Sequence, residues 1–248
     1  MIRAVTPTAG VVLAPNPGPM TLDGTNTWVL RAPSSQACVV VDPGPLVEQH
    51  LVEVASYGPV EVVLLTHGHL DHSEGAGRLA ELTGAPVRAL DPAHRLGGEG
   101  LVEGDVVAAA GIELRVLATP GHTSDSLSFA LPDAVLTGDT VLGRGTTVVA
   151  HPDGVLADYL TSLRRLRELG DRTVLPGHGP ELPSAGAAAE RYLAHREARL
   201  EQVRAAVEGG AADAEAVVRT VYADVDPSLW PAATLSVLAQ LRHLAERD

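Results

Sequence analysis

Apolar and polar positions alternate in two ways along this chain, and the pattern changes near residue 185. Before that point, short β-branched runs predict strands at residues 27–32, 37–42, 60–66, 86–90, 112–119, 126–131, 134–139 and 172–177. Apolar residues recurring every three or four positions predict helices at 46–58, 73–84 and 154–170, each ending at a glycine. Because antiparallel-looking runs mix with strand–helix alternation, we predict an α/β (α+β) fold with helices outside the sheets.

Beyond that point the chain is rich in Ala, Leu and Arg at helical spacing and has no strand-like run. We therefore predict two units, a catalytic domain at residues 1–185 and a small C-terminal helical module at 186–248. The sequence leaves three roles open for this module: a lid over the site, a homodimer contact or a nucleic-acid contact.

Composition removes several classes of chemistry. All 18 basic residues are arginine, which excludes Schiff-base lysines and the phosphate-binding lysine of Walker motifs. The formal net charge of −13 argues against strong binding of duplex nucleic acid, which depends on basic groups. The one cysteine, Cys38, lies in an apolar run and is expected to be a buried strand residue.

The N-terminal segment has no continuous apolar stretch before its prolines, so we do not expect a signal peptide. No apolar run reaches the roughly 18 residues that a membrane-spanning helix needs. We therefore expect a cytoplasmic protein without a membrane partner.

One short segment concentrates candidate chemistry. The sequence THGHLDH places His67, His69, Asp71 and His72 directly after a predicted strand. Alternate residues leaving a strand point to one side, so His67 and His69 are placed to share a metal ion, while Asp71 and His72 are placed to serve a second one.

Further ligand-type residues follow other predicted strands. His122 lies in PGHT, Asp139 in TGDT and His178 in PGHG. Each is weak alone, but together with THGHLDH they give five histidines and two aspartates at strand ends. Four other histidines on predicted helices or loops, His50, His94, His195 and His243, are expected to be solvated.

These four blocks, in this order, resemble the metallo-β-lactamase superfamily over roughly residues 10–180. The resemblance implies an αββα sandwich. It also implies that His67, His69 and His122 hold one metal ion, that Asp71, His72 and His178 hold a second, and that Asp139 bridges both.

The activity implied is hydrolysis by a hydroxide that bridges two divalent ions, with Asp71 and Asp139 as catalytic residues. Nitrogen and oxygen ligands without thiolate favour Zn²⁺, with Mn²⁺ or iron also compatible. No side-chain nucleophile is expected, because the chain lacks the G-x-S-x-G elbow of serine hydrolases.

Two flanking blocks, NPGPMTLDGTNT and LGRGTT, resemble the branch that contains the β-lactamase-like protein 2 endoribonucleases. The C-terminal segment is similar to the winged-helix tail of that branch, but it stops where a β-wing is expected, so we predict a truncated winged-helix-like module. The resemblance implies phosphodiester hydrolysis of short single-stranded RNA. The residues predicted to bind substrate are Asn26, Arg144, Gly145, Thr146 and Thr147.

Two alternatives remain open. A small-molecule thioester or lactone hydrolase similar to hydroxyacylglutathione hydrolase would share all seven predicted ligands. An iron persulfide dioxygenase would use two histidines and one aspartate, which His72 and His178 argue against.

Overall fold

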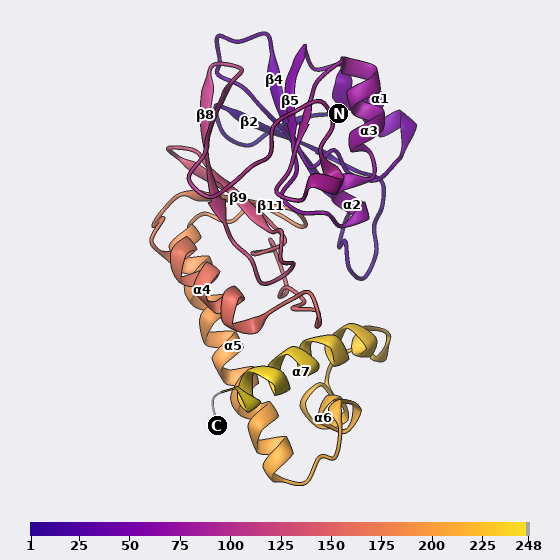
Figure 1. Cartoon of the computed structure of the whole chain (residues 1–248), viewed down its shortest axis with the longest axis vertical. Helices are drawn as coiled ribbons and strands as arrows, with labels where there is room; N and C mark the ends of the chain where they lie inside the picture. Colours follow the sequence, from indigo (N-terminus) through magenta and orange to yellow (C-terminus); the bar gives the residue numbers. More distant parts are fainter. Residues whose placement is uncertain (247–248) are drawn as a thin grey trace.

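The structure is a computed structural model that describes residues 1–246. Two β-sheets pack face to face with helices on both outer faces, and a group of helices extends from one end (Figure 1). This is the αββα sandwich that the sequence predicts, followed by a C-terminal helical module. Within the described residues, no helix is both long and apolar enough to cross a membrane.

The first sheet has six strands in sequential order, because each short apolar run pairs with the next one along the chain. Its strands are β1 (Arg3–Ala4), β2 (Ala9–Leu13), β3 (Asn26–Leu30), β4 (Cys38–Val41), β5 (Val60–Leu64) and β6 (Val87–Arg88). The first four strands are antiparallel, whereas β4, β5 and β6 are parallel to one another. The parallel strands are buried on both faces and therefore consist almost wholly of valine and leucine.

The second sheet has five strands in the order β11-β10-β9-β8-β7. Its strands are β7 (Val106–Ala109), β8 (Ile112–Ala118), β9 (Leu127–Ala130), β10 (Ala134–Gly138) and β11 (Thr173–Pro176). Only β10 and β11 run parallel, joined by a crossover that contains α4 (Leu156–Arg167). Strand ends that carry polar residues therefore gather at one edge of the sandwich.

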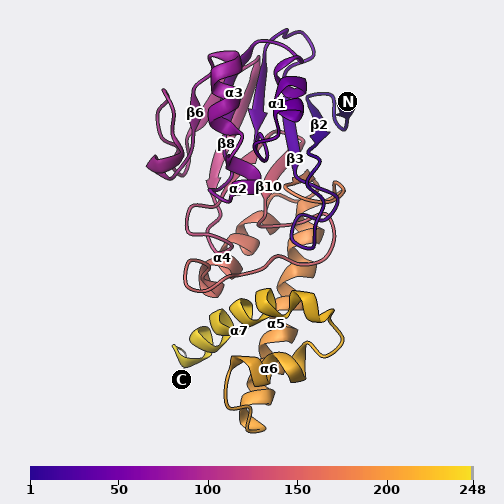
Figure 2. The same ribbon diagram turned by 90° about the vertical axis from the view of Figure 1, so that its right-hand side faces the viewer.

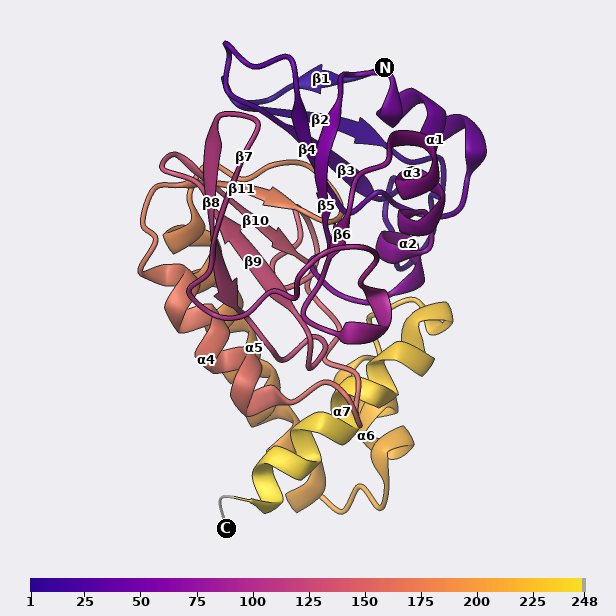
Figure 3. The same cartoon turned by 45° about the horizontal axis from the view of Figure 1, so that its top comes forward.

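Three layers of apolar side chains hold the sandwich together. Side chains such as Trp28, Val41 and Phe129 fill the space between the sheets. Helices α1 (Glu48–Ala55) and α3 (Ala76–Thr83) cover the outer face of the first sheet through Leu51 and Leu79 (Figure 3). Helix α4 and the first half of α5 (Ala185–Glu208) cover the second sheet.

The helical module surrounds the second half of α5. Helices α6 (Ala214–Val221) and α7 (Trp230–Ala245) pack against it, with the short 3₁₀ helix η2 (Pro227–Leu229) between them (Figure 2). Val203, Val217 and Val237 form its small separate core. Helix α7 also contacts α4, so the module rests on the sandwich.

The sequence pattern missed four short elements. It predicted no strand for β1, β2 or β7, and it began a helix at residue 73, whereas α2 already spans Leu70–Ser73. Alanine and glycine interrupt the β-branched runs of β2 and β7, and pairing of β1 with β2, of β2 with β3 and of β7 with β8 fixes these strands instead. The boundary at residues 185 and 186 stays a prediction.

Candidate metal centre

The segment THGHLDH leaves the C-terminal end of β5 and turns into α2. Strand β5 lies between β4 and β6 in the first sheet, and the turn after it meets the segments that follow β8, β10 and β11. His67 and His72 are buried, whereas His69 is exposed and Asp71 is 30% exposed. One short loop thus delivers four polar side chains to a largely buried site.

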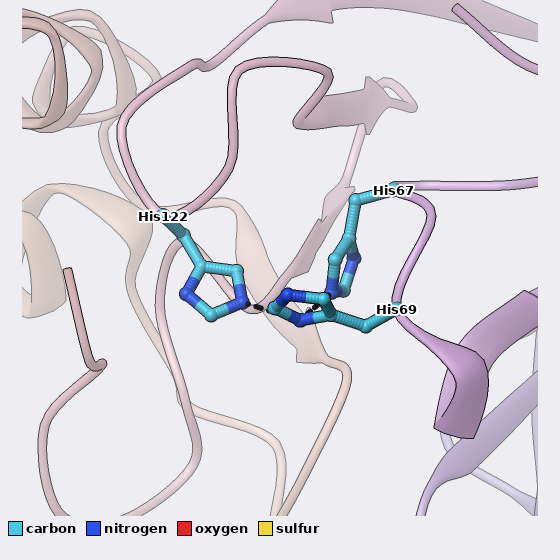
Figure 4. Close-up of side chains that lie close together, drawn as sticks. All are labelled: His67, His69 and His122. Atoms are coloured by element: carbon cyan, nitrogen blue, oxygen red, sulfur yellow. Dashed lines mark hydrogen bonds between the residues drawn. The ribbon is translucent and has the colours of Figure 1, made fainter. Parts of the chain in front are cut away.

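The imidazoles of His67, His69 and His122 point toward one another (Figure 4). His69 Nδ1 lies 3.1 Å from His67 Nε2 and 3.1 Å from His122 Nε2. His122 comes from the loop after β8, so residues distant in sequence complete this group.

A second group forms around His72, His178 and Asp71. His72 Nε2 lies 3.2 Å from His178 Nε2, and Asp71 Oδ2 lies 3.1 Å from the same atom of His178. His178 follows β11, the edge strand of the second sheet.

Asp139 lies between the two groups, directly after β10. One carboxylate oxygen, Oδ2, is 3.4 Å from His178 Nε2 and 3.8 Å from His122 Nε2. The other, Oδ1, is 3.4 Å from His72 Nε2 yet is buried without a hydrogen-bond partner in the described part of the chain. All seven residues predicted as metal ligands thus come together, and their ligand roles remain a prediction.

Each of four imidazoles uses its second nitrogen on an oxygen outside the cluster. His122 Nδ1 lies 2.7 Å from the Val148 carbonyl and His178 Nδ1 lies 3.1 Å from the Gly24 carbonyl. His67 Nδ1 lies 3.0 Å from Thr66 Oγ1, whose own hydroxyl donates to a carboxylate, and His72 Nδ1 lies 2.9 Å from the same carboxylate. A carbonyl or carboxylate can only accept, so Nδ1 donates outward and Nε2 faces the centre, where it offers a lone pair to a metal ion once the imidazole is neutral.

The carboxylate behind His67 and His72 belongs to Asp42, which the sequence analysis missed. It is 1% exposed, accepts from Thr66 N at 2.8 Å and from Thr66 Oγ1 at 2.7 Å, and sits at a positive φ of 52°. A non-glycine residue at such a φ marks a position that its surroundings strongly constrain. One indication was available in the sequence: Asp42 ends the strand-like run ACVVVD. Because β4 pairs with β5, this aspartate lies beside the segment THGHLDH that follows β5.

Burial and mutual charge set the protonation of the cluster. Burial, with the neighbouring histidines, holds the pKa of His67 well below its ordinary value, and burial also lowers the pKa of His122. Burial alone would lower the pKa of His178, but the charge of Asp139 and hydrogen bonds to Asp139 and Asp71 outweigh it and raise the pKa to about 9. Burial opposes ionisation of Asp139, yet His72 and His178 hold the pKa of that carboxyl well below its usual range.

These groups fit a divalent cation. The Nε2 atoms of His72 and His178 face each other at 3.2 Å, and a divalent cation between them would replace the proton that the raised pKa of His178 keeps on its imidazole. The orphaned Oδ1 of Asp139 offers a negatively charged ligand beside them. A Cβ at Gly177 would lie 2.5 Å from that oxygen, so only glycine keeps this space open. Imidazole and carboxylate ligands without thiolate suit Zn²⁺, Mn²⁺ or iron.

A cavity of about 310 Å³ opens onto this centre at His122 and Asp139. Four of the five residues predicted to bind substrate line it, in the loop after Asp139: Arg144, Gly145, Thr146 and Thr147. Thr147 is buried and donates to the Asp139 carbonyl at 2.7 Å, which fixes the backbone of that residue. Arg144 is half exposed and forms a two-point ion pair with Asp23.

The fifth residue, Asn26, lies elsewhere. It is 5% exposed, and its side-chain amide donates to the carbonyls of Pro176 and Gly179 at 3.0 and 2.8 Å. Both amide hydrogens therefore hold the turn that carries His178, and neither is available to a substrate. The expectation that the remaining histidines are solvated is wrong for His50 and His243, which are 4% and 7% exposed, and His50 contacts Thr27 Oγ1 at 2.9 Å.

The helical module contacts the loop after Asp139, and its role as a lid, a homodimer contact or a nucleic-acid contact stays a prediction. Arg196 of α5 is 5% exposed and donates to the Thr147 carbonyl, and Ser236 of α7 accepts from Val149 N at 3.3 Å. Between these two contacts lies Val148, whose carbonyl orients His122. The module thus holds the loop that positions one residue of the centre.

Comparison with known proteins places this geometry in a family. Residues 20–178 match the model of the metallo-beta-lactamase superfamily, and residues 214–248 match that of the beta-lactamase associated winged helix domain. The first match covers well over half of the chain and contains all seven cluster residues. The second begins at α6.

Comparison with individual proteins also shows similarity over most of the chain. The chain is 32% identical to "Beta-lactamase-like protein 2 homolog" of Caenorhabditis elegans, over 95% of this chain and 83% of that protein. It is 34% identical to "Atrochrysone carboxyl ACP thioesterase" of Aspergillus fumigatus, over 84% of this chain and 67% of that protein. A metallo-beta-lactamase family protein from Thermus thermophilus shares the fold, with a TM-score of 0.82, 24% identity and coverage of 98% and 95% of the two chains.

Proposed function

The chain belongs to the metallo-beta-lactamase superfamily, and on that premise we propose that it is a metal-dependent hydrolase that cleaves thioesters of largely apolar carboxylic acids. One observation carries the substrate class. The cavity that opens onto the His/Asp cluster is walled mainly by apolar side chains, among them Met20, Leu22, Leu142, Val225 and Leu229.

The size and lining of this cavity suit a small acyl group. Its volume of about 310 Å³ lies at the lower end of the range for small-molecule sites, roughly 300–1,000 Å³. An apolar acyl chain gains from leaving water here by roughly 25 cal/mol for each Å² buried. A chain of phosphodiesters has no such apolar surface to bury along its backbone.

The residues of the centre then have distinct tasks. A divalent ion, or a pair of them, would supply Lewis-acid activation of water and of the thioester carbonyl. His67, His69, His72, His122 and His178 would hold the metal through nitrogens whose orientation is largely set by outer oxygens, and Asp139 would hold it between the two groups.

Asp71 is the carboxylate best placed to move a proton. Its side chain is 30% exposed and therefore accessible to water, whereas that of Asp139 is 11% exposed. Burial alone would raise its pKa, but the hydrogen bond from His178 lowers the net value, so Asp71 is ionised at neutral pH. We assign it the role of accepting the proton of the attacking water and returning it to the leaving thiolate.

A second candidate is cleavage of short single-stranded RNA. Similarity to the β-lactamase-like protein 2 homolog over 95% of the chain favours it, as does the loop of Gly145, Thr146 and Thr147 at the wall of the cavity. The net charge of −13 opposes it, because affinity for nucleic acid depends on basic groups.

A direct assay separates the two. The purified chain, loaded with Zn²⁺ or Mn²⁺, is given the hexanoyl thioester of N-acetylcysteamine and, separately, a short single-stranded RNA. We expect chelator-sensitive hydrolysis of the thioester and no cleavage of the RNA. An Asp71→Asn variant should lose most thioesterase activity, while Asp158→Asn, at an exposed aspartate of α4 outside the cluster, serves as the matched control. Cleavage of RNA with an intact thioester would overturn the proposal.

A further inference from the structure

The part of the cavity wall that belongs to the helical module carries positive charge without a counter-charge. Arg196 and Arg199 lie one turn apart on α5 and both line the cavity. Within residues 1–246, neither guanidinium lies within 4.0 Å of a carboxylate. The only acidic residue among the cavity-lining residues described is Asp139, which belongs to the metal centre.

Arg196 is the more deeply placed of the two. It is 5% exposed, donates to the Thr147 carbonyl, and lies 5.1 Å from the centre of the Tyr159 ring. Its Nε has no hydrogen-bond partner among the described residues. A buried cation without an anionic partner is costly, so this wall holds positive potential that a bound anion would neutralise.

Arg199 is held in place by neutral groups. It donates to the Val221 carbonyl, and its guanidinium lies 4.2 Å from the centre of the Tyr222 ring. The contacts fix the planar group but leave its charge and its other N–H groups available. A guanidinium that is already ordered loses little conformational freedom when it binds a ligand.

The other cations near the cavity differ. Arg144 is paired at two points with Asp23, so its charge is compensated. Burial and the two arginines lower the pKa of His195, consistent with uncompensated positive charge on this side of α5.

We infer that Arg196 and Arg199 form an anion subsite for the substrate, at the module side of the cavity. Resting on the proposed thioesterase function, this assigns the substrate class as a thioester with an apolar body and a carboxylate or phosphate away from the scissile carbonyl. A guanidinium binds either anion through two parallel hydrogen bonds. The acyl group can carry the anion, as in a dicarboxylic acid monothioester, or the thiol can carry it, as in phosphopantetheine.

Three substrates test this assignment and distinguish the two sources. They are the hexanoyl and adipoyl thioesters of N-acetylcysteamine, which differ by one terminal carboxylate, and the hexanoyl thioester of phosphopantetheine. We expect kcat/KM of the metal-loaded protein to be higher for at least one anionic thioester than for the neutral one. A preference for adipoyl places the anion on the acid, and a preference for phosphopantetheine places it on the thiol.

Arg199→Met tests the subsite because it keeps the side-chain stem and removes the charge. We expect it to lower the ratio of kcat/KM for the preferred anionic thioester to that for the neutral thioester by about ten- to hundredfold, the usual loss for a charge-assisted hydrogen bond. Arg199→Lys should recover part of the loss. Arg204→Met, at an exposed arginine on the same helix, is the matched control and should change neither rate.

Binding of non-hydrolysable amide analogues, measured by calorimetry, separates the two proposals. If the wild-type chain hydrolyses no thioester, the proposed function fails, and the subsite stands only if Arg199→Met still weakens the adipoyl or phosphopantetheine amide selectively. If thioesters are hydrolysed but charge makes no difference to rate or affinity in either protein, the subsite is overturned while the thioesterase stands.

Discussion

The metal centre and the helical wall of the cavity, formed by Arg196 and Arg199, differ in how their charged groups are compensated. In the centre, opposite charges face one another, and four imidazoles are each anchored by an oxygen outside the cluster. Along the helical wall, two arginines contact carbonyls and aromatic rings but no carboxylate of the described residues. In the metal centre the charged groups compensate one another, which suits it to hold a metal ion. On the helical side of the cavity two positive charges lack a carboxylate partner, which suits that side to bind an anionic part of a substrate.

The largest effect is expected from removing Asp139, the carboxylate between the two groups of predicted ligands, because this removes the charge compensation of the metal centre. Asp139→Ala leaves His72 and His178 without their main counter-charge. We expect hydrolysis to fall by about a thousandfold or more, which corresponds to roughly 4 kcal/mol in the activation barrier. Metal content measured after purification should fall in parallel. Full activity in this variant would assign the turnover to a contaminant.

Asp42→Asn weakens the outer support of the centre and leaves every predicted ligand in place. The amide retains the shape of Asp42 but loses the charge that orients His72 and Thr66. We expect metal affinity to fall by about ten- to hundredfold, as for other partners of metal-bound histidines. Competition with a chromophoric chelator measures it, and unchanged affinity would show that the fold alone orients His72.

In the metal-free protein, the charge compensation of the metal centre makes the stability of the fold depend on pH. The pKa of His178 is raised from 6.5 to about 9, so its contribution to stability is fully present below about pH 6.5 and is lost as the pH rises through 9. We expect the free energy of unfolding to fall by on the order of 2 kcal/mol over this interval.

Chemical denaturation at several pH values measures this change. His178→Gln should flatten the profile, and bound metal should also flatten it. An equal slope in His178→Gln would place the titration in other groups.

Arg196→Met tests how far the helical wall supports the centre. It releases the Thr147 carbonyl and so loosens the loop whose Val148 carbonyl holds His122. We expect metal affinity to fall by up to about tenfold, less than for a direct partner of a ligand. Arg199→Met removes a side chain that is held by Val221 and Tyr222 instead, and it should leave metal affinity unchanged. Equal effects of the two variants would mean that the wall acts through its overall charge.

The smallest effect is expected at the rim of the cavity. Asp23 and Arg144 pair with 56% and 50% of their side chains exposed, so water and salt screen them. Asp23→Asn should change the free energy of unfolding by less than about 1 kcal/mol. The variant frees Arg144, and a gain in kcat/KM for anionic thioesters would extend the anion-binding wall to the predicted Arg144.

The sandwich and the cluster could be predicted because their information is local. Eight strand-like runs and the segment THGHLDH each lie within a few residues, and His122, Asp139 and His178 follow such runs directly. Asp42 was missed because its partner His72 lies 30 positions away and only the pairing of β4 with β5 brings them together. The arginine wall was missed because α5 has the sequence of a polar helix whose charges would normally face water.

The substrate-binding predictions show the same limit. The Gly/Thr loop after Asp139 lines the cavity, and its role in substrate binding stays a prediction, whereas Asn26 turns its amide toward the loop of His178. A sequence block indicates that a residue lies near a site. It does not show which neighbour takes its hydrogen bonds.

Helix α5 takes part in two cores, since Ala188 and Tyr192 pack against the sandwich and Val203 packs in the module. Its 24 residues form one continuous helix of about 36 Å, which rigidly connects the sandwich to the helical module. A continuous helix, rather than a flexible linker, therefore connects these two parts along one side of the cavity. Substitutions of single cavity-lining residues on α5 and α7 would therefore change substrate specificity without changing how the helical module packs on the sandwich.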